Sequence, residues 1–184
     1  MPFGSWLAST ADFHKDTARR SIDAHEAGLD ALFGLAIPSI LRSRPIWDGR
    51  RLANEAFSLE KSELVPLHRK SYFPSEPRWE ELAWFGNSKE DFMVHAVNSA
   101  STGVLVCTEA MFNEHARSYG VQGAALVAIP RATGIAIKPW LTAGAMAALV
   151  SGSFVASSNR VGHEPGGGHG SAAEGLPMRP MAAY

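Results

Sequence analysis

The sequence predicts a mostly α-helical membrane protein. A polar helical and extended N-terminal half precedes two to three small-residue-rich transmembrane or membrane-associated helices and a flexible Gly-rich tail. The first observation is the uncharged run from Pro139 to Asn159, which spans about 30 Å at helical rise. The second is that few charged residues lie between Phe92 and Ser158: Glu109, Glu114, Arg117, Arg131 and Lys138. We therefore expect an extramembrane region (1–88), a membrane-embedded helical region (89–160) and a tail (161–184).

Composition narrows the possible functions. The chain has 184 residues, enough for one domain with its own core, and a formal net charge of −1. Its basic residues form no cluster, which argues against a nucleic-acid-binding surface. The single cysteine, Cys107, excludes an intrachain disulfide, and we interpret it as a small buried packing residue. Because the first thirty residues include several acidic ones, they do not resemble a removable presequence, and any targeting information is expected to be internal or to have been cleaved before Met1.

In the N-terminal half, apolar residues at helical spacing predict an amphipathic helix from Thr10 or Asp12 to Pro38. A second helical stretch is expected between Pro45 and Pro66, and an extended linker from Pro66 to Pro77. A short turn ending at Gly86 then carries clustered tryptophans. They are typical of the aromatic belt at a membrane interface, or of a corner of a soluble core.

The C-terminal half supplies the predicted membrane segments. A helix is expected from Phe92 to Phe112 and a spanning helix from Pro139 to Asn159. Because Pro130 and Arg131 fall in its middle, the stretch from Tyr119 to Ile137 is expected to be an interfacial hairpin, with a broken span shielded by partners as the alternative. Small residues that recur every fourth position favour close helix packing in lipid. The predicted helix-packing residues are Gly103, Gly144, Ala148, Gly152 and Ala156, and the predicted membrane-interface residues are Trp79, Trp84, Lys138, Trp140 and Arg160.

Few patterns indicate chemistry. His163 and His169 flank Glu164, but they are six residues apart, whereas the helical zinc motif places its histidines four apart. No G-x-S-x-G motif occurs. The sequence therefore predicts no catalytic residue, no metal ligand and no cofactor, and the chain is not expected to be an enzyme.

Two stretches carry a family resemblance, Leu141 to Arg160 and, about forty residues earlier, Asn98 to Leu105. Together they resemble the first two helices of the mitochondrial inner-membrane translocase family and the related accessory subunit of respiratory complex I. The resemblance covers at most Phe92 to Arg160, and it implies small-residue helix faces, no catalytic residues and a scaffolding role. A second likeness, through Ala53 to Glu63 and Gly175 to Arg179, is to bacterial phasins.

The predicted function is that of a non-catalytic accessory subunit which stabilises a large membrane complex, either of the respiratory chain or of ATP synthase. Its expected location is the mitochondrial inner membrane, and its expected partners are other subunits and lipids, without nucleic acid. Two alternatives remain open. One is a soluble granule-coating protein of the phasin type, and the other is a small metal-dependent hydrolase.

Overall fold

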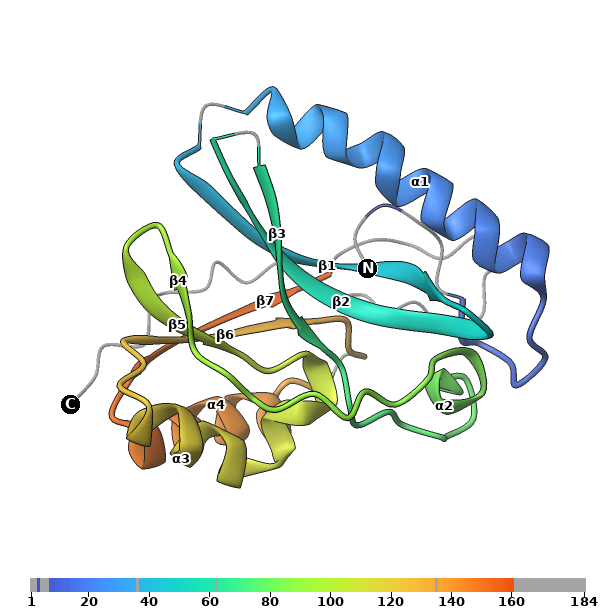
Figure 1. Cartoon of the computed structure of the whole chain (residues 1–184). Coiled ribbons are helices and arrows are strands. Elements are labelled where there is room, and N and C mark those ends of the chain that lie inside the picture. The colour runs from blue at the N-terminus through green and yellow to red at the C-terminus, as the bar shows by residue number, and fades with distance from the viewer. Residues whose placement is uncertain (1–2, 4–6, 36, 62, 135, 161–184) are drawn as a thin grey trace. The chain divides into compact units, whose positions relative to one another are not determined.

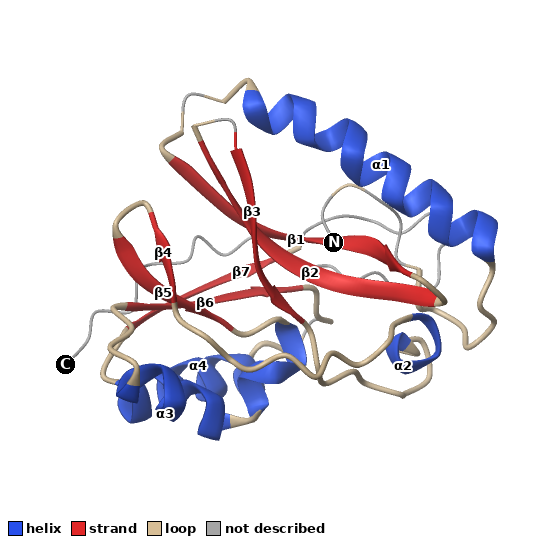
Figure 2. Ribbon diagram, in the orientation of Figure 1, coloured by secondary structure: helices blue, strands red, loops and turns tan. Residues whose placement is uncertain are grey.

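The computed structural model describes residues 3, 7–35, 37–61, 63–134 and 136–160 (Figure 1). They form helices and strands in a mixed α/β arrangement with two sheets (Figure 2). The prediction of a mostly α-helical protein is therefore wrong. The chain divides into two compact units, Met1–Glu90 and Asp91–Tyr184, called here the first and second units.

The first unit contains an antiparallel sheet of three strands in the order β1-β2-β3. Its elements are α1 (Lys15–Phe33), β1 (Ser39–Asp48), β2 (Arg51–Glu60), β3 (Glu63–Arg69) and α2 (Glu81–Trp84). The predicted amphipathic helix is confirmed as α1, which buries Leu32 against Phe57 and Leu59 of β2. The predicted short turn before Gly86 is confirmed as α2.

The helix expected between Pro45 and Pro66 is wrong, because this stretch forms β1, β2 and the start of β3. Every residue from 52 to 59 is buried, so both faces of β2 are covered. Such a strand lacks the alternation of apolar and polar residues that marks a half-exposed strand. Pro66 is not in a linker either. It pairs with Phe57 beside an irregularity in the register, a position where a strand tolerates proline.

The second unit contains a sheet in the order β4-β5-β6-β7, with β4 antiparallel to β5 and the other neighbours parallel. Its elements are β4 (His95–Val97), β5 (Ala100–Val104), the 3₁₀ helix η1 (Cys107–Met111), α3 (Asn113–Val121), β6 (Leu126–Arg131), α4 (Lys138–Ser151) and β7 (Phe154–Asn159). Helices α3 and α4 lie on one face of the sheet (Figure 1). There Tyr119 and Ala147 pack with Val127 and Ile129 of β6.

The predicted membrane helices are corrected here. The stretch Phe92 to Phe112 holds two strands and η1, and Pro139 to Asn159 holds most of α4 followed by β7. The chain leaves α4 at Gly152, which takes a left-handed φ of 68° and donates its N–H to the Ala148 carbonyl at 2.9 Å. No helix within the described ranges is long and apolar enough to cross a membrane.

The predicted helix-packing residues consequently lie in different elements. Gly144 and Ala148 are in α4, Gly152 ends it, Gly103 is in β5 and Ala156 is in β7. The predicted interface residues are equally scattered. Lys138 and Trp140 begin α4, Arg160 follows β7, Trp79 forms an isolated bridge with Glu76, and Trp84 is buried with its Nε1–H donated to the Thr10 carbonyl at 2.7 Å. The tail 161–184, with His163 and His169, lies outside the described residues.

Candidate active site

Three parallel strands of the second unit bring polar residues to one edge of the sheet. Cys107 comes three residues after the end of β5, Arg131 is the last residue of β6, and Asn159 is the last residue of β7. In parallel sheets the carboxyl ends of the strands are the usual place for ligand-binding and catalytic groups. This edge is the candidate site of the second unit.

Cys107 sits at the turn between β5 and the following helices. Its φ is +55°, a left-handed value that is uncommon for a residue with a side chain. The turn is fixed by the fully buried Glu109, whose carboxylate accepts the Val106 N–H at 2.7 Å. Only 8% of Cys107 is exposed, and its Sγ lies 3.7 Å from the Ala132 carbonyl oxygen. A strained strand-to-helix turn is the geometry that presents the nucleophile in α/β-hydrolases.

Tyr119 of α3 makes a hydrogen bond to the end of β5, just before this turn. Its hydroxyl donates to the Val104 carbonyl at 2.7 Å, and the ring is fully buried. Burial raises the pKa of Tyr119 well above its usual range, and the charge of Glu109 raises it further. Gly103 makes room for this ring, since a Cβ there would lie 2.4 Å from Tyr119 Cδ2. Tyr119 therefore remains a neutral hydrogen-bond donor to the end of β5.

Arg131 connects the ends of β6 and β7. Its Nε donates to Ser157 Oγ at 3.0 Å, and its Nη1 donates to Thr133 Oγ1 at 2.7 Å. The Thr133 backbone N–H is donated in turn to Asn159 Oδ1 at 3.1 Å. The guanidinium also lies 5.5 Å from the centre of the Trp140 ring. Burial lowers the pKa of Arg131, and negative charge on Cys107 opposes that shift.

The first unit contains a second buried ionisable cluster. Lys70, the residue after β3, places its Nζ 2.5 Å from Glu81 Oε2, and the two side chains are 0% and 4% exposed. The ammonium also lies 4.9 Å from the centre of the Phe73 ring. The Lys70 backbone N–H is donated to the Asn54 carbonyl, which fixes the chain at this point. Because burying two charges is expensive, this pair is a second functional candidate.

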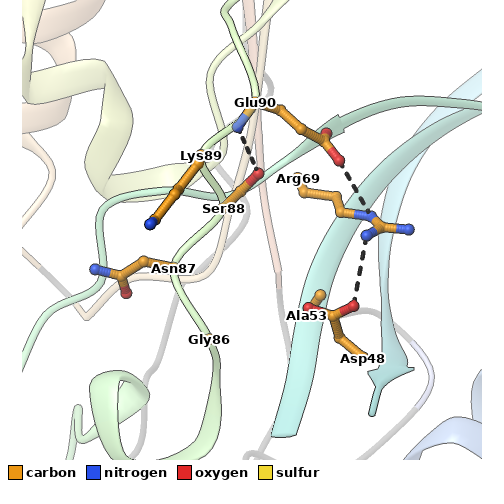
Figure 3. Close-up of a pocket in the computed structure, with 8 residues that line it drawn as sticks. All are labelled: Asp48, Ala53, Arg69, Gly86, Asn87, Ser88, Lys89 and Glu90. Atoms are coloured by element: carbon orange, nitrogen blue, oxygen red, sulfur yellow. Dashed lines mark hydrogen bonds and ion pairs between the residues drawn. The ribbon is translucent and has the colours of Figure 1, made fainter. Parts of the chain in front are cut away.

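A hollow of about 300 Å³ lies in the first unit around Arg69 (Figure 3). Its wall includes Asp48 and Glu90, whose carboxylates lie 3.6 and 3.7 Å from the Arg69 guanidinium, and Glu55 lies 3.5 Å from Arg69 Nε. Since Arg69 is paired with three carboxylates, we assign this hollow to a surface ion-pair network.

Sequence reasoning named none of the central residues of either cluster as functional. Three of the predicted site residues contact the second-unit site. Gly103 lies against the Tyr119 ring, Trp140 lies against the Arg131 guanidinium, and Arg160 donates its backbone N–H to the Arg131 carbonyl. One signal was present. Cys107 ends an apolar run and is followed closely by Glu109 and a helical segment, a strand–turn–helix pattern.

Comparison with known proteins identifies this arrangement. Residues 34–172 match the model of the carbon-nitrogen hydrolase family. The N-carbamoylputrescine amidase of Solanum tuberosum is 35% identical over 68 residues, which are 37% of this chain and 23% of that enzyme. The Arabidopsis thaliana enzyme of the same name is 34% identical over the same length.

Solved structures share the fold. A carbon-nitrogen hydrolase from Helicobacter pylori gives a TM-score of 0.73 at 19% identity, over 88% of this chain and 59% of that one. A mutant amidase from Nesterenkonia sp., which carries acrylamide added at its active-site cysteine, gives 0.70 at 22% identity, over 88% and 63%. The chain thus spans less than two thirds of the length of these proteins.

These matches overturn several predictions. The resemblance to the translocase family and the complex I subunit is wrong, and so is the function of a non-catalytic membrane subunit, because the family is one of hydrolases. The expectation that the chain is no enzyme is wrong for the same reason. The predictions of the mitochondrial inner membrane and of the respiratory chain are also wrong, since the family is one of hydrolases and the relatives are plant amidases. The expected partners, subunits and lipids but no nucleic acid, are not tested by these matches.

Proposed function

We propose, since this chain belongs to the carbon-nitrogen hydrolase family, that it hydrolyses amide carbon–nitrogen bonds with Cys107 as the nucleophile. The observation that carries this proposal is the position of the only cysteine of the chain, at a strained strand-to-helix turn beyond a parallel strand. Thiolates are strong nucleophiles toward carbonyl carbon.

The proposed reaction has two halves. The Cys107 thiolate attacks the amide carbonyl, the carbon–nitrogen bond breaks, and the amine leaves with a proton, so that the acyl group is held as a thioester on Sγ. Water then attacks the thioester carbonyl, which releases the carboxylic acid and restores the thiol. Each turnover consumes one water and yields one acid and one amine or ammonia.

Two lines of comparison support the chemistry. Mutant forms of the Nesterenkonia amidase carry covalent adducts of acrylamide and of the acetamide part of fluoroacetamide at the active-site cysteine. The plant relatives act, by their names, on N-carbamoylputrescine, in which a carbamoyl group is bonded to an amine. We therefore propose small linear amides and N-carbamoyl amines as the substrate class.

We also propose that the Lys70–Glu81 pair is required for turnover. A lysine that is fully buried against a glutamate is costly to keep for stability alone, since apolar residues of similar volume often replace such pairs without loss. Buried, paired ionisable groups are concentrated at functional sites. The double variant Lys70→Met/Glu81→Leu separates the two roles, because it is expected to fold yet to lose at least about 100-fold in kcat/KM, or about 2.7 kcal/mol.

The central test is an assay of the purified chain for ammonia released from acetamide, acrylamide and N-carbamoylputrescine. Cys107→Ala is expected to abolish release, and Cys107→Ser to leave at most a trace, with thermal unfolding within a few degrees of wild type. Intact-mass spectrometry of the wild type with fluoroacetamide should show the acetamide moiety added to Cys107, with the sulfur bonded to its methylene carbon and fluoride lost. Unchanged turnover in Cys107→Ala would remove this residue from the mechanism.

A further inference from the structure

We infer that Arg131 is a positioning residue for Cys107: it fixes the Ala132 carbonyl against the thiol and supplies the positive charge that balances the thiolate. This inference rests on the proposed role of Cys107 as nucleophile. It concerns a residue from a different strand, β6, that lies 24 positions later in the chain.

The first step of the argument is the contact with Ala132. Cys107 Sγ donates to the Ala132 carbonyl oxygen at 3.7 Å, so the place of this carbonyl decides where the sulfur points. Ala132 has no polar side chain of its own, and its position depends on its two neighbours. Both of them, Arg131 and Thr133, are held by hydrogen bonds to β7.

The second step is that several contacts hold the Arg131 side chain, and these contacts with Ser157, Thr133 and Trp140 are called here the Arg131 clamp. Its Nε is bonded to Ser157 Oγ, and that hydroxyl is itself donated to the Ile129 carbonyl at 3.2 Å. Its backbone carbonyl accepts the Arg160 N–H at 3.0 Å. With the Trp140 ring against its guanidinium, the Arg131 side chain is therefore held by Ser157 of β7, Thr133 and Trp140 of α4. Such a side chain has one conformation, and it transmits that order to the neighbouring peptide.

The third step concerns charge. Within the part of the chain that the structure describes, no carboxylate lies at ion-pair distance from Arg131, although burial lowers the pKa of this guanidinium. The negative charge that opposes this shift is that of Cys107. Electrostatic interactions are mutual, so the cation favours the thiolate by the same free energy. A half-buried cation that lacks a carboxylate partner is suited to an anion formed beside it.

Other groups near Cys107 do not supply this charge. Glu109 on η1 carries a carboxylate, which opposes a thiolate, and Tyr119 on α3 is neutral because burial raises its pKa. On α4, Trp140 is uncharged, and Lys138 is exposed to solvent at the first position of the helix. Arg131, in contrast, is a cation whose pKa responds to the charge of Cys107.

The test measures alkylation of Cys107 by iodoacetamide as a function of pH, which is unambiguous because the chain has one cysteine. Arg131→Gln is expected to raise the pH midpoint of alkylation by about one to three units, the range for an opposite charge at close distance. The matched control Arg117→Gln removes the same charge from an exposed position of α3, and its midpoint should stay within about 0.3 units of wild type. Equal midpoints for the two variants would refute the inference.

Two further variants keep the inference testable if Arg131→Gln does not fold. Arg131→Lys retains the charge without the hydrogen bonds to Ser157 and Thr133. Ser157→Ala retains Arg131 and removes one anchor of the clamp. Both should keep the alkylation midpoint within about 0.5 units, because the charge remains, while kcat falls about tenfold at unchanged KM. A midpoint in Arg131→Lys that is raised as far as in an uncharged variant, or wild-type kcat in both, would contradict the inference.

Alkylation also separates this inference from the proposed function. If Cys107→Ala retains activity, the nucleophile assignment fails, yet the pH midpoints still report whether Arg131 and Cys107 are coupled. If Cys107→Ala is inactive and the midpoint of Arg131→Gln equals that of Arg117→Gln, the proposed function stands and the role of Arg131 falls.

Discussion

The buried pair Lys70–Glu81 offers the largest single effect on stability that the structure allows us to work out. Replacing Lys70 with methionine leaves the Glu81 carboxylate, 4% exposed, without its counter-ion. Breaking such a pair from one side destabilises proteins by about 3 to 5 kcal/mol. Replacing Glu81 with leucine leaves the ammonium without a partner. Breaking the pair from this side is expected to cost a similar free energy, about 3 to 5 kcal/mol.

The double variant Lys70→Met/Glu81→Leu removes both charges at once and should lie within about 1 kcal/mol of wild type. The expected coupling energy is therefore at least about 5 kcal/mol, above the range of about 0.5 to 3 kcal/mol that is usual for neighbouring residues. Urea unfolding, followed by circular dichroism at pH 7, measures all four free energies of unfolding. A single variant that is already unfolded counts as a loss of at least the whole wild-type stability.

The matched control is the pair Arg19–Asp23 on α1, whose side chains are 79% and 58% exposed at 3.5 Å. Arg19→Met/Asp23→Leu and the two single variants should give a coupling of at most about 0.5 kcal/mol, as expected for an exposed pair. If the buried pair coupled no more strongly than this exposed pair, the reasoning from burial would be refuted.

Two further predictions concern Tyr119 and the glycine beneath it. Gly103→Ala should destabilise the chain by about 1 to 3 kcal/mol through overpacking against the Tyr119 ring. The control Gly144→Ala in α4 places its Cβ 3.9 Å from Val155 and should stabilise the chain by up to about 1 kcal/mol through helix propensity. Thermal unfolding of both variants measures the two effects. Because the pKa of Tyr119 is raised in the folded state, its contribution to stability is present at neutral pH and is lost as pH rises above about 10. Tyr119→Phe should therefore flatten the loss of stability between about pH 9 and 11, and an unchanged slope would contradict the assignment.

Part of this fold follows from the sequence. The helix α1 has a long amphipathic pattern and starts within a few residues of its predicted position. The strand β2 could not be predicted from the sequence in the same way. Leu52, Ala56 and Leu59 lie at helical spacing, while every residue between them is also buried. Local pattern cannot distinguish a strand covered on both faces from a buried helix. This segment forms a strand because it pairs with β1 on one side and β3 on the other.

The site was harder to predict than the fold. Cys107, Arg131 and Asn159 are separated by 24 and 28 residues, so no short motif contains them. They meet because each strand–helix–strand unit returns the chain to the same edge of a parallel sheet. An interpretation that places helices where β5 and β7 lie cannot produce this edge. A single cysteine is then attributed to packing.

The small-residue pattern nevertheless correctly indicates that helices in this chain pack closely. A Cβ at Gly120 of α3 would lie 2.4 Å from the carbonyl oxygen of Ser151 at the end of α4, so these two helices approach backbone to backbone. Lipid is not required for such an approach, since Ala143 and Ala147 allow α4 to lie close against the sheet as well. Hydrogen bonds between the strands fix the spacing of β5, β6 and β7, and the two helices cover one face of this sheet. Small residues of the kind that suggested a membrane helix therefore let α3 and α4 pack against each other and against the sheet.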